Sequence, residues 1–255
     1  MKILDYVDKT CREQMKVIGE MFTSAGLDSV FAEQFRKVRA EIFRSGDAVR
    51  TILVTSATQG EGKSLIAANL AVMISRDLNK HALLVEADLR NPVMCRYFGL
   101  QNGTGLSDYL TGSAGINEIF VRTDQAKLTI VPAGEPLLNS GELVGSLKMT
   151  ELVREMRSRY PDRFIIIDSP PLLETSDPLL LSSFVDSILL VIRSGVTPRE
   201  AVKQALGNLP QEKIIGIILN DLKFRSDSMH KRYFGTYGYY GYRQRKNLNE
   251  EIASE

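Results

Sequence analysis

The sequence has little of several features that would point to particular partners or compartments. It carries 32 Lys and Arg against 31 Asp and Glu, and this balance gives no global reason to expect nucleic-acid binding. Two cysteines, Cys11 and Cys95, are too few for a disulfide framework and lack metal-ligand spacing, so a reduced, cytosolic compartment is the simplest expectation. The two histidines, His81 and His230, are isolated, and we predict no transition-metal site.

Long apolar stretches are also missing from the sequence. Its first residues, Met1 to Glu20, are charged and lack the apolar core of a signal peptide. No run approaches the roughly 20 apolar residues that a membrane-spanning helix needs. If the protein works at a membrane, we expect another component to hold it there. The composition is otherwise ordinary for a globular protein, and 255 residues suit one α/β domain with a sizeable core.

Short apolar runs without strict alternation indicate strands that are covered on both faces. They are Thr51–Thr55, Ala82–Glu86, Leu128–Pro132, Phe164–Asp168, Ser187–Ile192 and Ile214–Leu219. Helical patterns lie between them, at Lys63–Arg76, Glu142–Arg159 and Pro198–Asn208. This alternation predicts an α/β fold, with a doubly wound, mainly parallel sheet and flanking helices. An amphipathic helix is expected before the first strand, from helically spaced Leu27, Val30, Phe31, Phe35, Val38 and Ile42.

The segment Ala57–Ser64 has the features of a phosphate-binding loop, although its first position holds Ala where the strict pattern has Gly. Gly60 and Gly62 let backbone N–H groups converge on phosphate oxygens at a helix N-terminus. Lys63 would reach the β- and γ-phosphates, and Ser64 would ligate Mg²⁺. The alternative is an ordinary Gly-rich turn. The expected nucleotide contacts are Thr58, Gln59, Gly60, Glu61, Gly62, Lys63, Ser64 and Leu65.

Acidic residues stand at the ends of two further predicted strands. Asp168 ends one of them and would orient Mg²⁺ through a coordinated water, unless it is merely a solvated strand terminus. Glu86 and Asp88 end the other and lie two residues apart, so an extended segment presents them on the same side. One could serve the metal while the other accepts a proton from an attacking hydroxyl. Alternatively, both only pair with Arg90.

These three motifs, in this order, resemble the Walker A, A′ and B motifs of the bacterial tyrosine kinases (BY-kinases) of polysaccharide export, relatives of the MinD/ParA-type ATPases. The matching segments are Ala57–Ser64, Leu83–Arg90 and Ile165–Pro171, within a resemblance from about Glu33 to Tyr242. It implies a P-loop NTPase fold and an ATP:protein-tyrosine phosphotransferase that uses ATP and Mg²⁺. The implied catalytic residues are Lys63, Glu86, Asp88 and Asp168, and the implied metal residues are Ser64, Asp88 and Asp168.

Two of these implied sites are at Glu86 and Asn220. Glu86 stands where the family usually has Asp, the expected base for the tyrosine hydroxyl. Its longer side chain keeps the carboxylate but shifts it, and misplacement by about 1 Å can cost roughly 10²-fold in rate. Asn220 occupies the strand end at which the wider class often recognises adenine.

The helix before the first strand carries a charged stripe, Glu33, Arg36 and Arg39, whose spacing puts the three side chains on one helix face. From the residues alone, internal salt bridging is the simpler interpretation. The stripe also resembles the family's Glu-x-x-Arg-x-x-Arg subunit-contact motif, which implies a homo-oligomer, in the form of a ring. The predicted kinase domain, residues 1–222, would then include an N-terminal oligomerisation helix.

Residues 223–255 are expected to form a flexible, tyrosine-rich C-terminal tail. Five of the nine tyrosines fall within ten residues, interleaved with Gly and flanked by basic residues; they are Tyr233, Tyr237, Tyr239, Tyr240 and Tyr242. A low-complexity aromatic tail or a stacking surface for single-stranded nucleic acid would also have this composition. The resemblance favours autophosphorylation, each subunit presenting its tail to the active site of a neighbour.

The resemblance further implies partners and a location. It suggests a separate transmembrane activator of the chain-length-regulator type, a tyrosine phosphatase and no nucleic acid, with the kinase in the cytoplasm at the inner face of the cell membrane. Its output would be control of capsule or exopolysaccharide synthesis and export. A MinD/ParA-like ATP-hydrolysing switch is one alternative, although Thr58 stands where those proteins have an extra Lys. A non-catalytic nucleotide-binding scaffold is another.

Overall fold

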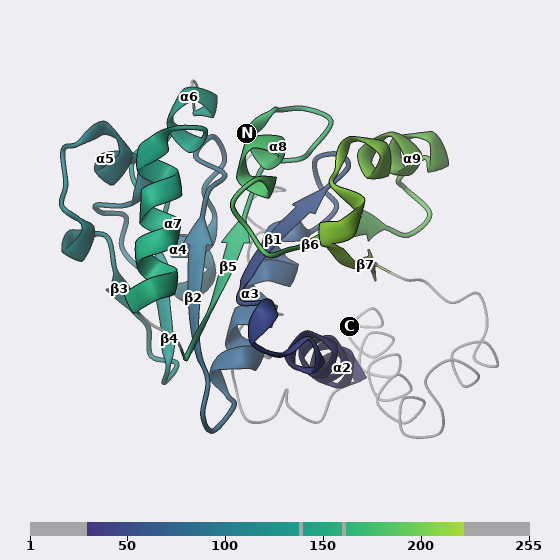
Figure 1. Cartoon of the computed structure of the whole chain (residues 1–255), viewed down its shortest axis with the longest axis horizontal. Coiled ribbons are helices and arrows are strands. Elements are labelled where there is room, and N and C mark those ends of the chain that lie inside the picture. The colour runs from purple at the N-terminus through teal and green to yellow at the C-terminus, as the bar shows by residue number, and fades with distance from the viewer. Residues whose placement is uncertain (1–29, 138–139, 160–161, 222–255) are drawn as a thin grey trace, which may run out of the picture.

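A single sheet forms the centre of the computed structural model, which describes residues 30–137, 140–159 and 162–221 (Figure 1). Its seven strands lie in the order β3-β4-β2-β5-β1-β6-β7. Only β3 is antiparallel to its neighbour. The strands are β1 Thr51–Ser56, β2 His81–Glu86, β3 Val121–Arg122, β4 Leu128–Val131, β5 Arg163–Asp168, β6 Ser187–Arg193 and β7 Ile214–Asn220. The predicted doubly wound, mainly parallel sheet is confirmed.

Helices cover both faces of the sheet. One layer holds α2 Val30–Arg44, α3 Lys63–Ser75 and α4 Met94–Phe98. The other holds α5 Leu106–Thr111, α6 Gly141–Val144, α7 Leu147–Arg159, α8 Asp177–Ser182 and α9 Arg199–Asn208. Within the described ranges, short 3₁₀ turns lie at Gly46–Ala48, Ile116–Glu118 and Gln211–Lys213. Successive residues of β1 point to opposite layers, Ile52 to the first and Leu53 to the second, which explains why the strand is apolar without alternation.

The sheet brings the predicted site together at one edge. Strand β1 leads through the glycine-rich loop into α3, and β5 lies beside β1 with Val54 opposite Asp168. Strand β2 lies on the other side of β5 with Glu86 opposite Asp168. Because these strands are parallel, all of their carboxyl ends meet at the same edge, where ligands bind in folds of this kind.

Two details differ from the sequence prediction. The helix predicted over Glu142–Arg159 is two helices, α6 and α7, interrupted at Gly145. A Cβ atom at Gly145 would lie 2.7 Å from a terminal methyl of Leu180 in α8, so any larger residue there would require that side chain to move. Strand β3 was not predicted, because its two residues leave no periodic pattern to detect. His81 begins β2, as expected.

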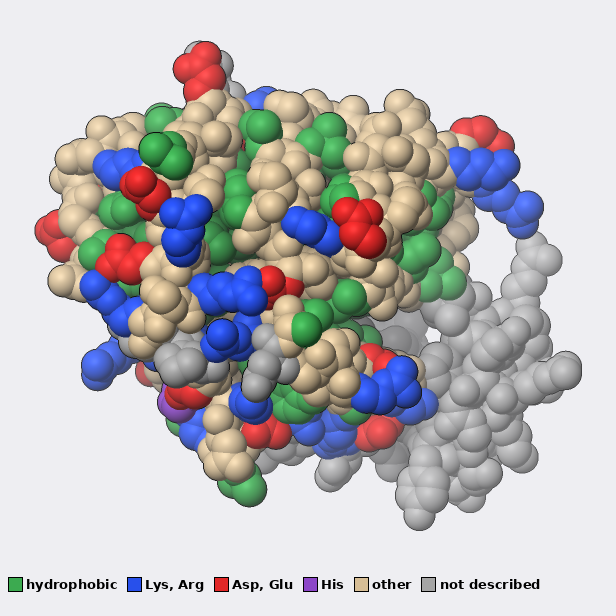
Figure 2. All heavy atoms as spheres, in the orientation of Figure 1, with side chains coloured by type: hydrophobic (Ala, Val, Ile, Leu, Met, Phe, Trp, Pro, Cys, Tyr) green, Lys and Arg blue, Asp and Glu red, His purple; other side chains and the backbone are tan. Residues whose placement is uncertain are grey.

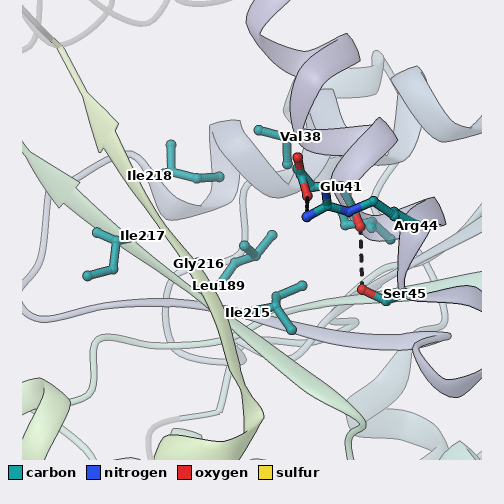
Figure 3. Close-up of a pocket in the computed structure, with 10 residues that line it drawn as sticks. Val38, Glu41, Arg44, Ser45, Leu189, Ile215, Gly216, Ile217 and Ile218 are labelled. Atoms are coloured by element: carbon teal, nitrogen blue, oxygen red, sulfur yellow. Dashed lines mark hydrogen bonds and ion pairs between the residues drawn. The ribbon is translucent and has the colours of Figure 1, made fainter.

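Strand β7 forms an edge of the sheet and exposes apolar side chains. Ile217 is 49% exposed and Leu219 51% exposed, and Figure 2 shows apolar side chains gathered on this side of the molecule. A groove of about 340 Å³ separates β7 from α2 (Figure 3), with Val38 and Ile42 on the helix side. No residue of the glycine-rich loop lines this groove. Among the described residues, no helix is both long enough and apolar enough to cross a membrane.

Candidate functional site

The glycine-rich loop between β1 and α3 requires glycine at two positions. Gly60 and Gly62 have φ angles of +80° and +89°, a region that other residues rarely adopt. A Cβ atom at Gly62 would also lie 2.2 Å from the side-chain nitrogen of Asn220. The backbone conformation therefore favours glycine there, and any side chain would also displace Asn220. The loop opens α3 with Gly62 as the N-cap, so its N–H groups face the site where a helix N-terminus favours anions.

Glu61 ties this loop to two other segments. Its buried carboxylate accepts hydrogen bonds from the Thr58 N–H, at 2.9 Å, and from the hydroxyl of Thr197 in the connection after β6. The Asn220 side chain donates to the Glu61 carbonyl at 2.8 Å. Asn220 therefore supports the loop from the end of β7, and its expected contact with adenine stays a prediction.

Further loop contacts come from residues that the sequence prediction did not include. The Gln59 N–H donates to Glu174 Oε1 at 2.7 Å, and Arg193 reaches the Gly60 carbonyl at 3.5 Å. Arg193 and Thr197 lie in Val191–Glu200, a further segment that resembles the family, so this segment could have pointed to them. Glu174 follows the Walker B segment in an irregular turn, and nothing in its sequence context marks it.

Lys63 faces an acidic partner across the site. Its ammonium lies 3.0 Å from Asp88 Oδ2, and both side chains are largely buried. Burial opposes the charge on Lys63, but Asp168 and Asp88 more than offset it and raise its pKa above the ordinary value. Arg90 instead contacts Ser140 at 3.1 Å and Asp177 at 4.0 Å. The alternative in which Glu86 and Asp88 only pair with Arg90 is therefore wrong.

Asp168 is fully buried at the end of β5, so it is not a solvated strand terminus. Neither of its carboxylate oxygens has a partner at hydrogen-bond geometry within the described part of the chain, although the Ser64 hydroxyl lies close enough to favour its charged form. Burial raises its pKa to about 7, against the opposing effects of Lys63 and the Ser64 hydroxyl, and the nearby Glu86 and Asp88 raise it further. A buried carboxylate without a partner is costly, and a bound cation would remove that cost.

Mg²⁺ fits this set of residues. The described residues contain no group of three His, Cys, Asp or Glu side chains arranged to hold a metal by themselves. Mg²⁺ in nucleotide sites, however, takes most of its ligands from phosphates and water and only one or two from side chains. The oxygens of Asp168, the nearby Asp88 and the hydroxyl of Ser64 would supply that smaller set.

Glu86 lies beside Asp168 but is bonded in a different way. Its side chain is 1% exposed, and Oε1 accepts the N–H groups of Val93 and of Met94, the latter at 2.8 Å. Oε2 accepts the N–H of Ala133 at 3.1 Å. Burial raises its pKa even though these bonds favour the charged form. Glu86 thus reaches the site as predicted, with both oxygens engaged.

The charged stripe on α2 makes contacts within the chain. Glu33 and Arg36 form an exposed ion pair at 2.7 Å, and Arg39 donates to the Met73 carbonyl near the end of α3 at 3.0 Å. These contacts agree with the salt-bridge interpretation, and the subunit-contact role stays a prediction. The five clustered tyrosines lie outside the described residues.

The fold and this site define a class of protein: a phosphate-loop nucleotide-binding protein with a doubly wound sheet. No protein-family model matches the chain. It is 35% identical over 218 residues to the tyrosine-protein kinase YwqD of Bacillus subtilis, covering 84% of this chain and 87% of YwqD. The tyrosine-protein kinase CpsD of Streptococcus agalactiae is 33% identical, with 84% and 91% covered. The chain therefore belongs to the family of bacterial tyrosine-protein kinases.

Solved structures agree with this assignment. The kinase domain of the Escherichia coli tyrosine kinase ETK superposes with a TM-score of 0.71 at 27% identity, with 76% of each chain covered. A ParA family ATPase from Chlorobium tepidum, at a TM-score of 0.58 and 20% identity, shares the fold alone.

Proposed function

We propose that this tyrosine kinase transfers the γ-phosphoryl group of ATP to its own C-terminal tyrosines and so regulates exopolysaccharide or capsule synthesis and export. The observation that carries the proposal is the charged centre at the strand ends. There the ammonium of Lys63 pairs with Asp88 at 3.0 Å beside the unpartnered, buried carboxylate of Asp168. Phosphoryl transfer depends mainly on positioning and on neutralising charge, and this centre offers both.

Different residues of the site would bind the phosphates and Mg²⁺. Backbone N–H groups of the loop and the Lys63 ammonium hold the phosphates, and Ser64, Asp88 and Asp168 would hold Mg²⁺, which neutralises phosphate charge when bound. The tyrosine oxygen forms a bond to the γ-phosphorus while the bond to the β,γ-bridging oxygen breaks, and ADP leaves. The hydroxyl proton passes to a carboxylate of the site. Asn220 would contact adenine from the end of β7.

Coverage of the relatives supports a separate activator. The chain spans most of YwqD and CpsD but only 25% of the succinoglycan biosynthesis transport protein ExoP of Rhizobium meliloti. ExoP therefore carries other segments besides the kinase region, and we expect a transmembrane partner chain to act with the kinase here. That chain would hold the kinase at the inner face of the cell membrane. The proposal includes a ring of subunits joined through Glu33, Arg36 and Arg39, and a tyrosine phosphatase that resets the tail.

Mass spectrometry of the Tyr233–Tyr242 segment tests the proposal. The full chain is incubated with ATP and Mg²⁺, together with the transmembrane protein encoded nearest to it, and phosphate should accumulate on the clustered tyrosines. Lys63→Met should abolish it, and Asp168→Asn should lower it by about 10²–10³-fold. The matched controls Lys203→Met and Asp124→Asn, at exposed positions away from the loop, should keep wild-type labelling.

Other outcomes identify the alternatives. Release of inorganic phosphate without tyrosine modification would favour an ATP-hydrolysing switch. Nucleotide binding with neither activity, in the presence of the activator, would favour a scaffold. A mixture of Lys63→Met chains with chains whose five tail tyrosines are Phe tests the exchange between subunits. Phosphate should then appear on the tails of the Lys63→Met chains, because the other subunits provide the active sites.

A further inference from the structure

Resting on the proposed function, we propose that Glu86 is a positioning residue that clamps the connection carrying Asp88, and that it does not accept the proton of the tyrosine hydroxyl. Its place at the end of β2 would suit a base. Its contacts suit a clamp, because both carboxylate oxygens are bonded to backbone N–H groups of two different segments.

The clamp closes a short loop. Residues 87–93 connect β2 to α4, and Glu86 accepts N–H groups at the far end of that connection, from Val93 and Met94. The third bond, from Ala133, joins the same carboxylate to the segment that follows β4. At its near end the connection is tied to β5, since the Ala87 N–H donates to the Asp168 carbonyl at 2.8 Å. Both ends of the connection are therefore fixed.

The fixed connection sets the place of Asp88. Within it, Asp88 Oδ1 accepts the Asn91 N–H at 3.2 Å, which leaves Oδ2 directed at Lys63. A shift of the connection would carry Asp88 away from the phosphate-binding lysine. Since displacements of about 1 Å at a reacting centre can cost roughly 10²-fold in rate, loss of the clamp should act on catalysis through Asp88.

Little of the Glu86 carboxylate is left for a substrate. A carboxylate offers about four acceptor sites in total, and three N–H groups already occupy most of them on a side chain that is 1% exposed. An incoming hydroxyl would have to reach the one remaining site, on Oε2 of this buried side chain, or displace a backbone N–H, which would then lie buried without a partner. Asp at this position would be one methylene too short to reach both segments from the same backbone.

A series of substitutions at position 86 separates the two roles. A base needs a carboxylate, so Glu86→Asp should outperform Glu86→Gln, and Gln should lose about 10²–10⁴-fold. A clamp needs a side chain long enough to contact both segments and an oxygen that accepts their N–H groups. Glu86→Gln keeps the length and one acceptor for Val93 and Met94, so it should retain about a tenth or more of the wild-type rate. Glu86→Asp and Glu86→Ala should lose about 10²-fold.

Tail phosphorylation is measured in the full chain with its activator, at a temperature where every variant is folded, and Mg·ADP affinity is measured alongside. A higher phosphorylation rate in Glu86→Gln than in Glu86→Asp supports the clamp. An equal or higher rate in Glu86→Asp overturns it.

Hydrogen exchange at the amides of Val93, Met94 and Ala133 gives a second readout, which does not depend on kinase activity. The amides of Val93 and Met94 should stay protected from exchange in Glu86→Gln and lose their protection in Glu86→Asp and Glu86→Ala. If all three amides were as protected in Glu86→Ala as in wild type, the clamp would be overturned. An inactive wild type would contradict only the proposed function, since the exchange result still decides the clamp.

Discussion

The ends of β2 and β5 lie side by side and each carries a buried carboxylate, yet the two carboxylates are bonded in opposite ways. Glu86 accepts three backbone N–H groups, whereas Asp168 accepts none from the described residues. Burial raises both pKa values. Burial alone therefore does not distinguish a structural carboxylate from one that is available to bind a ligand. The number of backbone N–H groups bonded to each carboxylate does distinguish them.

Because of this difference, the two carboxylates should contribute to folding stability in opposite directions. Hydrogen bonds offset only part of the desolvation of Glu86, whose pKa is still raised. Removing the side chain would leave three N–H groups without their acceptor, so Glu86 should stabilise the folded chain. Asp168 has only the charge of Lys63 and the hydroxyl of Ser64 to offset its own desolvation, so it should weaken the ligand-free protein. Substitutions at the two positions are expected to change stability with opposite signs.

The largest effect should appear in activity. Asp168→Asn removes the charge that would hold Mg²⁺, and tail phosphorylation should fall by about 10²–10³-fold, as when a group that stabilises transition-state charge is lost. Steady-state labelling with ATP over a range of Mg²⁺ concentrations measures this. A variant restored to the wild-type rate by high Mg²⁺ would show that Asp168 contributes affinity only.

Glu86→Ala should have the largest effect on stability. It leaves three N–H groups without their acceptor, and a loss of about 3 kcal/mol is expected from unmet buried hydrogen bonds. Glu118→Ala is the matched control, because Glu118 is exposed and accepts a single N–H, from Gly115; it should lose under about 1 kcal/mol. Urea unfolding at pH 7 compares the two. Equal losses would contradict the clamp's contribution to stability.

Asp168→Asn should stabilise the ligand-free chain, and increasingly so at higher pH. The unfolded Asp titrates near its ordinary value of 3.8 and the folded one near 7. Between these values the folded state holds the extra proton, so this group lowers stability as pH rises from about 4 to about 7. The variant should equal wild type near pH 4 and exceed it at pH 8 by up to about 4 kcal/mol. Melting curves across this range would refute the idea if the gap stayed constant.

The smallest expected effect concerns a third buried carboxylate, Glu61, which resembles Glu86 in being bonded. Thr197→Val removes the hydroxyl that donates to Glu61 and accepts the Arg193 N–H but keeps the size of the side chain. We expect a loss of about 1 kcal/mol in stability and a few-fold loss in nucleotide affinity, because the loop loses one anchor. Calorimetry with Mg·ADP measures the affinity, and an unchanged value would show that Asn220, Glu174 and Arg193 suffice to hold the loop.

Much of this arrangement could be predicted from the sequence. Apolar runs identified the strands of the parallel sheet, and glycines with a lysine identified the loop, since both patterns follow directly from local geometry. The bonding of Glu86 could not be predicted, because Ala133 lies 47 residues away and is brought near only by the pairing of β2 with β4. Glu174 was missed for the same reason, since its contact with Gln59 depends on how the turn after β5 folds back.

The most direct test of the division between the two strand ends is the melting-temperature shift produced by Mg·ADP in three proteins. Wild type and Glu86→Gln should both be stabilised by the ligand, because Asp168 is intact in each. Asp168→Asn should respond to ADP without the additional shift from Mg²⁺. A full Mg²⁺-dependent shift in Asp168→Asn, or its loss in Glu86→Gln while the Val93 and Met94 amides stay protected, would contradict the assignment of the cation to the end of β5.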